Sequence, residues 1–388
     1  MRLTFAKSPA ATLGIEWELA LTNKDTGELS NCAPEIIADL KKLSPRQLAA
    51  RPTAELLQNT VELVSSPHQT VPAAIAEMQE LAALLVQVAD AHNVAPIGAG
   101  GHPFATWEQQ LATDTARYRE FMHNYGWWGR NMLIWGIHTH IGIAAQNLAI
   151  PTLNKLLNYQ PHLIALAASS PFWLSDDTSY ASNRTMLFQQ LPSAGLPPEI
   201  ATWEDFEAAI ADLQRYGIIT EVNEARWDIR PAPQWGTLEL RACDSVSDLE
   251  TLGAISALSQ CLTAEAASQK HTPPEQMPLP RIICAENKWR ASRYGFAAEI
   301  ITNSQGATAK LGAHLAATCE RLLPFAADLG CTKELEYARN RALNCANSST
   351  EQLACYNRQL QQGNDKHTAL QEVVRFLQRD FRESVSRA

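Results

Sequence analysis

The chain has 388 residues, of which 46% are hydrophobic and 19% charged, a balance that excludes wholesale disorder. Its formal net charge of −9 excludes a general nucleic-acid or anionic-membrane surface, although a local site can still be positive. The length suffices for one large domain or two, and no run approaches the roughly 18 apolar residues of a membrane helix.

Short apolar runs rich in Ile, Val, Leu and Trp predict strands over residues 13–21, 59–64, 94–98, 134–143 and 237–243. Helices with a proline near the first turn are predicted between them, over residues 34–42, 72–92 and 151–169. After about residue 247 the pattern is helical, over residues 249–269, 280–294, 307–326 and 365–384. Strands early and helices late predict an α+β fold with a helical C-terminal portion (about 247–388), as a single domain spanning residues 1–388.

Three of the predicted strands carry polar side chains two positions apart, separated by apolar or small residues. Residues i and i+2 of a strand point to the same face, about 7 Å apart. One exposed strand would explain any single pair, because charged residues are usually solvated. Three pairs, joined by two acidic residues near the second strand, favour one shared polar face. The residues concerned are Glu16 and Glu18, His138 and His140, Glu239 and Arg241, together with Glu55 and Glu62.

The side chains of this face narrow the chemistry. Several glutamates with a histidine suit hard cations such as Mg²⁺ or Mn²⁺ better than zinc, and Mg²⁺ commonly bridges carboxylates to substrate phosphates. Arg241 on the same face would neutralise the charge that builds on a phosphoryl group in transfer. Neither GxxxxGK[ST] nor GxGxxG after a strand occurs, so the usual glycine-rich nucleotide folds are not indicated.

Four other segments leave alternatives open. Arg184, in an apparent long loop, and Arg230 would each grip a substrate carboxylate or form a structural salt bridge. The glycine-rich stretch 96–103 reads equally as a substrate-contacting loop or as a tight turn that holds His102. Residues 117–119 are expected on a solvated helix face.

The eight cysteines contain no CxxC pair and are spread through apparent helices. This usage predicts reduced, mostly buried thiols in a cytoplasmic protein, not a disulfide framework.

Six stretches carry a resemblance to a known family: GIEWELAL, TVELVS, PIGAGGHPFATW, RYREFMHNYGWWGRNMLIWGIHTHIGI, WDIRPAPQWGTLELRACD and ENKWRASRYG. They run in the family's order from about residue 12 to residue 296. On them the chain resembles the carboxylate–amine ligase branch of the glutamate–cysteine ligases. The chain departs from the pattern at Trp17, where many members have an acidic residue, and in the tail around residues 363–365.

The resemblance implies a glutamine-synthetase-like core, in which a curved, mainly antiparallel sheet forms a half-barrel with helices on its outer face. It also implies the use of ATP and a cluster of divalent cations, Mg²⁺ or Mn²⁺, on that sheet. By position, Arg241 matches a catalytic arginine and His140 a second histidine that orients substrate. The matched metal ligands are Glu16, Glu18, Glu55, Glu62, His138 and Glu239.

The implied reaction joins the side-chain carboxylate of glutamate to an amine, with cysteine as the first candidate. ATP would phosphorylate the carboxylate, the amine would attack the acyl phosphate, and ADP and phosphate would leave. A different amine acceptor is the main alternative; a metal-dependent amidohydrolase or a non-catalytic binding protein ranks lower. The expected partners are small-molecule substrates, with no nucleic acid and no membrane, and a homodimer stays open.

Overall fold

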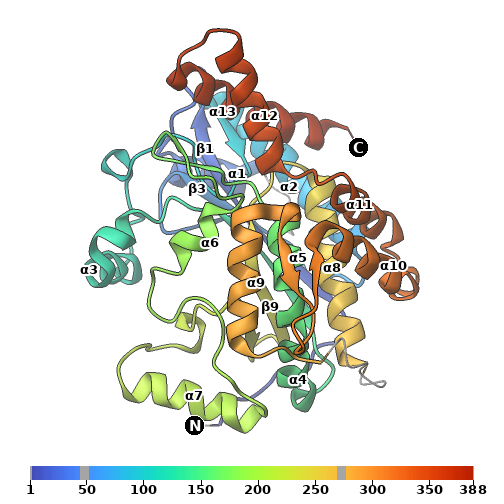
Figure 1. The fold of residues 1–388 in the computed structure, drawn as a ribbon. Coiled ribbons are helices and arrows are strands. Elements are labelled where there is room, and N and C mark those ends of the chain that lie inside the picture. The colour runs from blue at the N-terminus through green and yellow to red at the C-terminus, as the bar shows by residue number, and fades with distance from the viewer. Residues whose placement is uncertain (1, 44–51, 269–276, 388) are drawn as a thin grey trace.

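Seven strands form one open antiparallel sheet that is surrounded by helices (Figure 1). The computed structural model describes residues 2–43, 52–268 and 277–387. The strand order is β2-β3-β1-β5-β9-β8, and β4 also pairs with β1. The strands of this sheet are β1 (Leu13–Asn23), β2 (Pro52–Ala54), β3 (Thr60–Val64), β4 (Val94–Ile97), β5 (Gly136–Gly142), β8 (Ile229–Ala232) and β9 (Thr237–Asp244).

Alternation along β1 separates a dry face of the sheet from a polar one. Ile15, Trp17 and Leu19 are 0–1% exposed and point into the main core, whereas Glu16 and Glu18 between them are only half-buried. The large apolar side chains favour this arrangement, because full burial of each is worth about 1.5–3 kcal/mol. The dry face therefore fixes which face the polar residues occupy.

Helices α2 (Val71–Ala91) and α8 (Leu249–Ala267) pack on each other, and both contact β1. In the described ranges α2 is the one helix long and apolar enough to cross a membrane, by length and composition alone. Its apolar residues recur every three or four positions and are buried against the sheet and α8. That burial is typical of a core helix in a globular domain.

The described residues after 247 are mostly helical, as predicted, and they also include the short hairpin of β10 (Glu299–Ile301) and β11 (Thr308–Lys310). Figure 1 shows α12 (Ser348–Gln361) and α13 (Lys366–Ser386) at one end of the molecule, opposite α7 (Trp203–Arg215) and the N-terminus. Besides α8, the other helices of this portion are α9 (Arg281–Tyr294), α10 (Leu311–Leu329) and α11 (Thr332–Leu343).

All five predicted strands are present in the seven-stranded sheet, whose other two strands, β2 and β8, were not predicted. The strands of the two small hairpins, β6 (Phe172–Trp173) with β7 (Asp176–Asp177) and β10 with β11, were not predicted either. Strands β2 and β8 each have only a few residues and contain proline, Pro52 or Pro231, which sequence patterns place outside sheets. Both lie at the ends of the strand order, where a missing backbone N–H is tolerated. The last residue of the predicted helix 249–269, Gln269, lies outside the described residues.

Several helix predictions were wrong in detail. The predicted helix 151–169 is two helices, α4 (Gln146–Leu156) and α5 (Gln160–Ala167), and Pro151 lies inside α4 instead of starting it. The expected loop around Arg184 contains α6 (Asn183–Phe188), whose N-cap Ser182 accepts a hydrogen bond from the Thr185 N–H. The remaining helices are α1 (Ala33–Leu43) and α3 (Ala116–Arg130), and a separate hairpin joins β6 to β7.

The glycine-rich stretch 96–103 is a close-packed turn with a satisfied histidine, which favours the structural reading. The His102 ring is buried, with Nε2 2.8 Å from the Gly27 carbonyl and Nδ1 accepting from the Ala105 N–H. A side chain at Gly98 would place its Cβ 1.9 Å from the Val246 carbonyl oxygen, so only glycine fits there.

The eight cysteines are all free thiols, and five of them are buried, as predicted. Cys345 is exposed and departs from that prediction.

Asp380 on α13 gives a prediction for stability. Burial, with the nearby charges of Asp248 and Glu351, raises the pKa of Asp380 to about 7 from an ordinary 3.8. Between these pH values Asp380 is protonated in the folded protein and ionised in the unfolded chain. Its contribution to the free energy of unfolding therefore falls as pH rises and stays lower above pH 7. Asp380→Asn should therefore raise the free energy of unfolding at pH 8 by roughly 1–2 kcal/mol, and hardly at pH 4. Thermal unfolding at both pH values checks this; an equal gain at both would trace the effect to packing.

Candidate active site

Strand register brings the predicted polar residues together on one face of the sheet. Glu16 on β1 pairs in register with His138 on β5, and His140 pairs with Glu239 on β9. On the other side of β1, Glu18 is opposite Glu62 on β3. Directly paired side chains on one face lie close enough to interact. Four strands that were predicted separately therefore build one continuous polar row, which consists of Glu62, Glu18, Glu16, His138, His140 and Glu239.

One end of the row is a group of three carboxylates. Oxygen atoms of Glu18, Glu55 and Glu62 all lie within 4.8 Å of one another. Thr53 donates a hydrogen bond of 2.7 Å to Glu62, and the Gly136 N–H donates one of 2.5 Å to Glu18. These bonds hold carboxylates that otherwise repel one another.

The pKa values of these three carboxylates are all raised. Burial and the charge of Glu55 raise the pKa of Glu18 to about 7. Burial raises the pKa of Glu55, and burial with three neighbouring carboxylates raises that of Glu62 well above the usual range. Like charges held in a low-dielectric site disfavour ionisation unless a cation joins them. The donor set therefore fits a hard divalent cation.

Glu16 links this group to the two histidines. His138 Nδ1 lies 2.9 Å and His140 Nε2 3.2 Å from the two oxygens of Glu16. Burial alone would raise the pKa of Glu16, but its hydrogen bonds to the two imidazoles outweigh burial and lower that pKa. Burial, with the charge of Arg241, lowers the pKa of His138 to about 4, so this ring is neutral at pH 7.

Two further groups of ligand atoms lie close together, and Glu16 belongs to both of them. One contains Glu62 and His138, and the other contains His140 and Glu239. All six predicted metal ligands, and His140, therefore fall into three groups of ligand atoms with mutual distances within 4.8 Å. These are the residues that could hold more than one cation.

The other end of the row holds arginines around Glu239. Arg230 on β8 donates to Glu239 from Nε at 3.1 Å and from Nη2 at 2.6 Å, and Arg241 pairs with the other oxygen. Although burial opposes it, the charges of Arg241 and Arg230 lower the pKa of Glu239 to about 2. Arg230 also donates to the Ala225 carbonyl and lines neither of the two cavities on this row, which favours the salt-bridge alternative for it.

Arg184 on α6 lies beside Gly136 of β5 and Arg241 of β9. Its guanidinium donates to the Arg241 carbonyl at 3.4 Å and reaches the cavity beside the row. A Cβ at position 136 would lie 2.1 Å from Arg184 Nη2, so Gly136 is what admits the arginine. Of the two roles considered from the sequence, binding of a substrate carboxylate is still available to Arg184.

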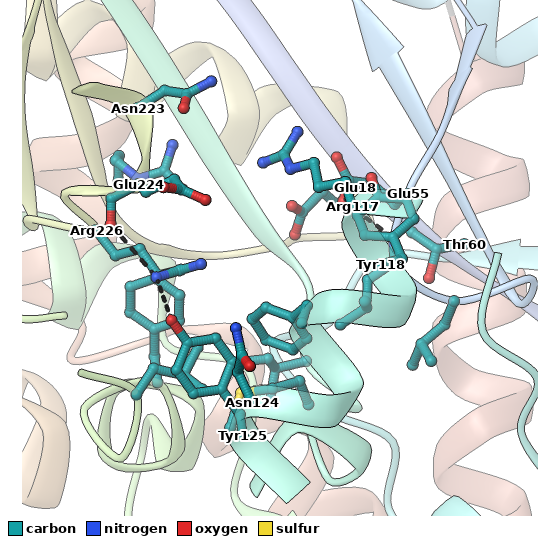
Figure 2. A pocket seen from close by; sticks show the side chains of 18 of the residues that line it. Glu18, Glu55, Thr60, Arg117, Tyr118, Asn124, Tyr125, Asn223, Glu224 and Arg226 are labelled. Atoms are coloured by element: carbon teal, nitrogen blue, oxygen red, sulfur yellow. Dashed lines mark hydrogen bonds between the residues drawn. The ribbon is translucent and has the colours of Figure 1, made fainter. Parts of the chain in front are cut away.

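A cavity of about 200 Å³ opens beside Glu18, His138 and Arg241. Figure 2 shows its two walls: Glu18 and Glu55 with Arg117 and Tyr118 on one side, and Tyr125 with Arg226 on the other. Helix α3 supplies much of the lining. Arg117 and Arg119 are exposed, as predicted for a solvated helix face, and Arg119 pairs with Asp114 in solvent. Tyr118 is half-buried, and both Arg117 and Tyr118 also line the cavity.

Sequence reasoning missed the wall residues Tyr125 and Arg226. For Tyr125 the sequence signal is the density of aromatic and basic residues in 117–130, which alone predicts no partner, and no comparable signal marks Arg226. A second cavity, of about 250 Å³, lies on the opposite side of Glu16 and His140 and is lined by Trp235 and Thr237. The polar row thus lies between two cavities.

Comparison with known proteins gives a consistent result. Residues 12–374 match the sequence profile of "Glutamate-cysteine ligase family 2 (GCS2)". A protein of Leifsonia xyli subsp. xyli named "Putative glutamate--cysteine ligase 2" is 43% identical over 384 residues, 99% of each chain. A protein of the same name from Micrococcus luteus is 44% identical over 338 residues, 86% of this chain and 85% of its own.

Two solved structures share the fold at low sequence identity. Glutamate–cysteine ligase of Francisella tularensis in complex with AMP has a TM-score of 0.64 at 13% identity, covering 99% of this chain and 92% of its own. A bifunctional glutathione synthetase from Pasteurella multocida has a TM-score of 0.61 at 13% identity, covering 95% of this chain and 52% of its own.

Proposed function

We propose a specific reaction for this chain, which belongs to glutamate–cysteine ligase family 2 and is an ATP-dependent ligase. It joins the side-chain carboxylate of glutamate to the amine of cysteine. ATP supplies the phosphoryl group that activates the carboxylate, and the products are the amide, ADP and phosphate.

The observation that carries the proposal is the row of carboxylates, imidazoles and arginine between two cavities. Glu18, His138 and Arg241 line the first cavity, and Glu16 and His140 line the second. A ligation of this kind has to bring a triphosphate and a carboxylate together at one charged centre. Two cavities that share one row of charged groups suit substrates that approach from either side.

Divalent cations, Mg²⁺ or Mn²⁺, fit this row, because burial and mutual repulsion raise the pKa values of Glu18, Glu55 and Glu62 and a bound cation would offset that repulsion. When bound, such cations supply neutralisation and orientation of the ATP phosphates. We assign their ligands to Glu16, Glu18, Glu55, Glu62, His138 and Glu239.

The chain's own residues then position and stabilise the reacting groups. An oxygen of the glutamate side chain attacks the γ-phosphorus, the bond to the β-phosphate oxygen breaks, and ADP leaves with that electron pair. The amine nitrogen next attacks the activated carbonyl carbon, loses a proton, and inorganic phosphate leaves. Arg241, buried beside Glu239, presents a fixed positive charge to the phosphoryl oxygens. His140, paired with Glu16, is assigned to the orientation of substrate.

The test is ADP release with glutamate and each of the twenty amino acids and simple amines, in the presence of Mg²⁺. We expect ADP and phosphate in equal amounts, dependent on both glutamate and an amine, with cysteine giving the highest kcat/KM. AMP and pyrophosphate would contradict the acyl-phosphate route. Hydrolysis of amides without ATP would favour an amidohydrolase, and a better amine than cysteine would replace the acceptor only.

A further inference from the structure

Arg226 forms the wall of the first cavity that faces the carboxylate group of Glu18 and Glu55 across the gap (Figure 2). It lies in the segment between α7 and β8, far in sequence from the polar strands. Its Nη1 donates to the Tyr125 hydroxyl at 3.2 Å and to the Glu224 carbonyl at 3.3 Å.

Among the described residues the Arg226 guanidinium forms no ion pair. Although burial opposes it, backbone N–H groups and the charge of Arg226 lower the pKa of Glu224, which lines the same cavity, so this carboxylate interacts with Arg226 only beyond ion-pair distance. Within the described ranges no Asp or Glu oxygen lies within 4.0 Å of Arg226, in contrast to Arg230 and Arg241, which both pair with Glu239. Its neighbours are instead two rings of α3, with the Arg226 guanidinium carbon 5.5 Å from the Phe121 ring centroid and 5.2 Å from that of Tyr125. Because its hydrogen bonds to Tyr125 and Glu224 are made through Nη1, an arginine stacked in this way can still offer Nε and Nη2 to a carboxylate.

The backbone around Arg226 is held on both sides. Arg230 donates to the carbonyls of Asn223 and Ala225, directly before it, and the Arg226 carbonyl accepts from the Gly195 N–H. The next segment is fixed by the Asp228 N–H, which donates to the Gly195 carbonyl at 2.7 Å. A binding group on a fixed backbone needs little ordering when the ligand arrives.

From this placement we propose that Arg226 binds the α-carboxylate of the glutamate substrate, a role that rests on the function proposed above. A glutamate held this way has its α-carboxylate on the wall of Arg226 and its side-chain carboxylate directed to the polar row. The first cavity is then the donor site, and Arg226 selects amino acids that carry a carboxylate at both ends.

The experiment compares glutamate with 4-aminobutyrate, which is glutamate without its α-carboxylate. Arg226→Ala should lower kcat/KM for glutamate by roughly 10- to 100-fold, mainly through KM, because one charge-assisted bidentate contact is lost. The same variant should change kcat/KM for 4-aminobutyrate and the KM for ATP by no more than about twofold. Arg226→Lys, which keeps the charge but loses the fork, should restore part of the selectivity.

Two further variants separate binding from support of α3. Tyr125→Phe breaks the hydrogen bond to Arg226 but keeps the ring, and it should retain the preference for glutamate. Arg215→Ala removes an exposed arginine that also stacks on a tyrosine, Tyr216, and it should match the wild type. If Tyr125→Phe reproduces the loss, or if Arg226→Ala weakens both substrates equally, Arg226 only supports α3 and the proposal is overturned.

Equilibrium binding by calorimetry keeps this inference distinct from the proposed reaction. Wild-type protein should bind glutamate more tightly than 4-aminobutyrate, and Arg226→Ala should bind both alike. If this binding result is found but glutamate is not turned over, the site for the α-carboxylate stands and the proposed ligation reaction is overturned. The assignment of Arg226 to glutamate would be overturned if the wild type bound neither glutamate nor 4-aminobutyrate. It would also be overturned if Arg226→Ala lost only its preference for cysteine over cysteamine, which is cysteine without its carboxylate.

Discussion

Glu18→Gln is expected to lower ATP turnover by at least roughly 10³-fold while leaving the fold intact, because the change removes a charge from the proposed cation site at constant size. Glu18 belongs to the carboxylate group with Glu55 and Glu62 and has a pKa raised to about 7. Its ionised form is therefore costly in the protein without cations. Steady-state release of ADP measures the loss.

The same substitution separates a cation site from a structural one. Without Mg²⁺, Glu18→Gln should unfold at the wild-type temperature or above it at pH 8, since a folded-state pKa above the ordinary value means that ionisation destabilises the fold. The rise in melting temperature that Mg²⁺ gives the wild type should be lost. Glu108→Gln, at an exposed position, should behave as wild type in both measurements. A Glu18→Gln protein with normal turnover and normal Mg²⁺ dependence would exclude Glu18 as a ligand.

The polar row could be predicted from sequence because it is a property of strands. The period of two places Glu16 with Glu18, and His138 with His140, on one face wherever the apolar residues between them are buried. The order of the strands and their register are set by long-range pairing, which no local pattern contains. The direct pairing of Glu16 with His138 is therefore found only in the fold.

The walls of the cavities were not predictable for a related reason. Arg226 and Tyr125 are about one hundred residues apart and meet only because α3 and the segment before β8 pack at the same end of the sheet. Arg230 illustrates the converse. Its sequence context left a substrate grip and a salt bridge equally open, and the structure pairs it with Glu239 through two nitrogens.

Arg241→Lys is expected to lower kcat by roughly 10²-fold or more, with a much smaller change in the dissociation constant of ATP. The Arg241 guanidinium lines the first cavity and pairs with Glu239, and its buried Nε has no hydrogen-bond partner among the residues that the structure describes. In the proposed reaction, a planar cation in this position would direct its donors to the oxygens of the phosphoryl group, where charge builds up. Lysine keeps the charge but offers a single flexible ammonium group, so the loss falls on the transition state.

Arg230→Lys is the matched control, since Arg230 holds the same glutamate, Glu239, but lines neither cavity. If Arg241 only neutralises Glu239, the two lysine variants should lose activity equally. If Arg241 acts on the phosphoryl group, Arg241→Lys should lose far more kcat than Arg230→Lys does. Equal losses in kcat and in ATP affinity for Arg241→Lys would mean that Arg241 stabilises only the ground state. A wild-type kcat would remove it from the mechanism altogether.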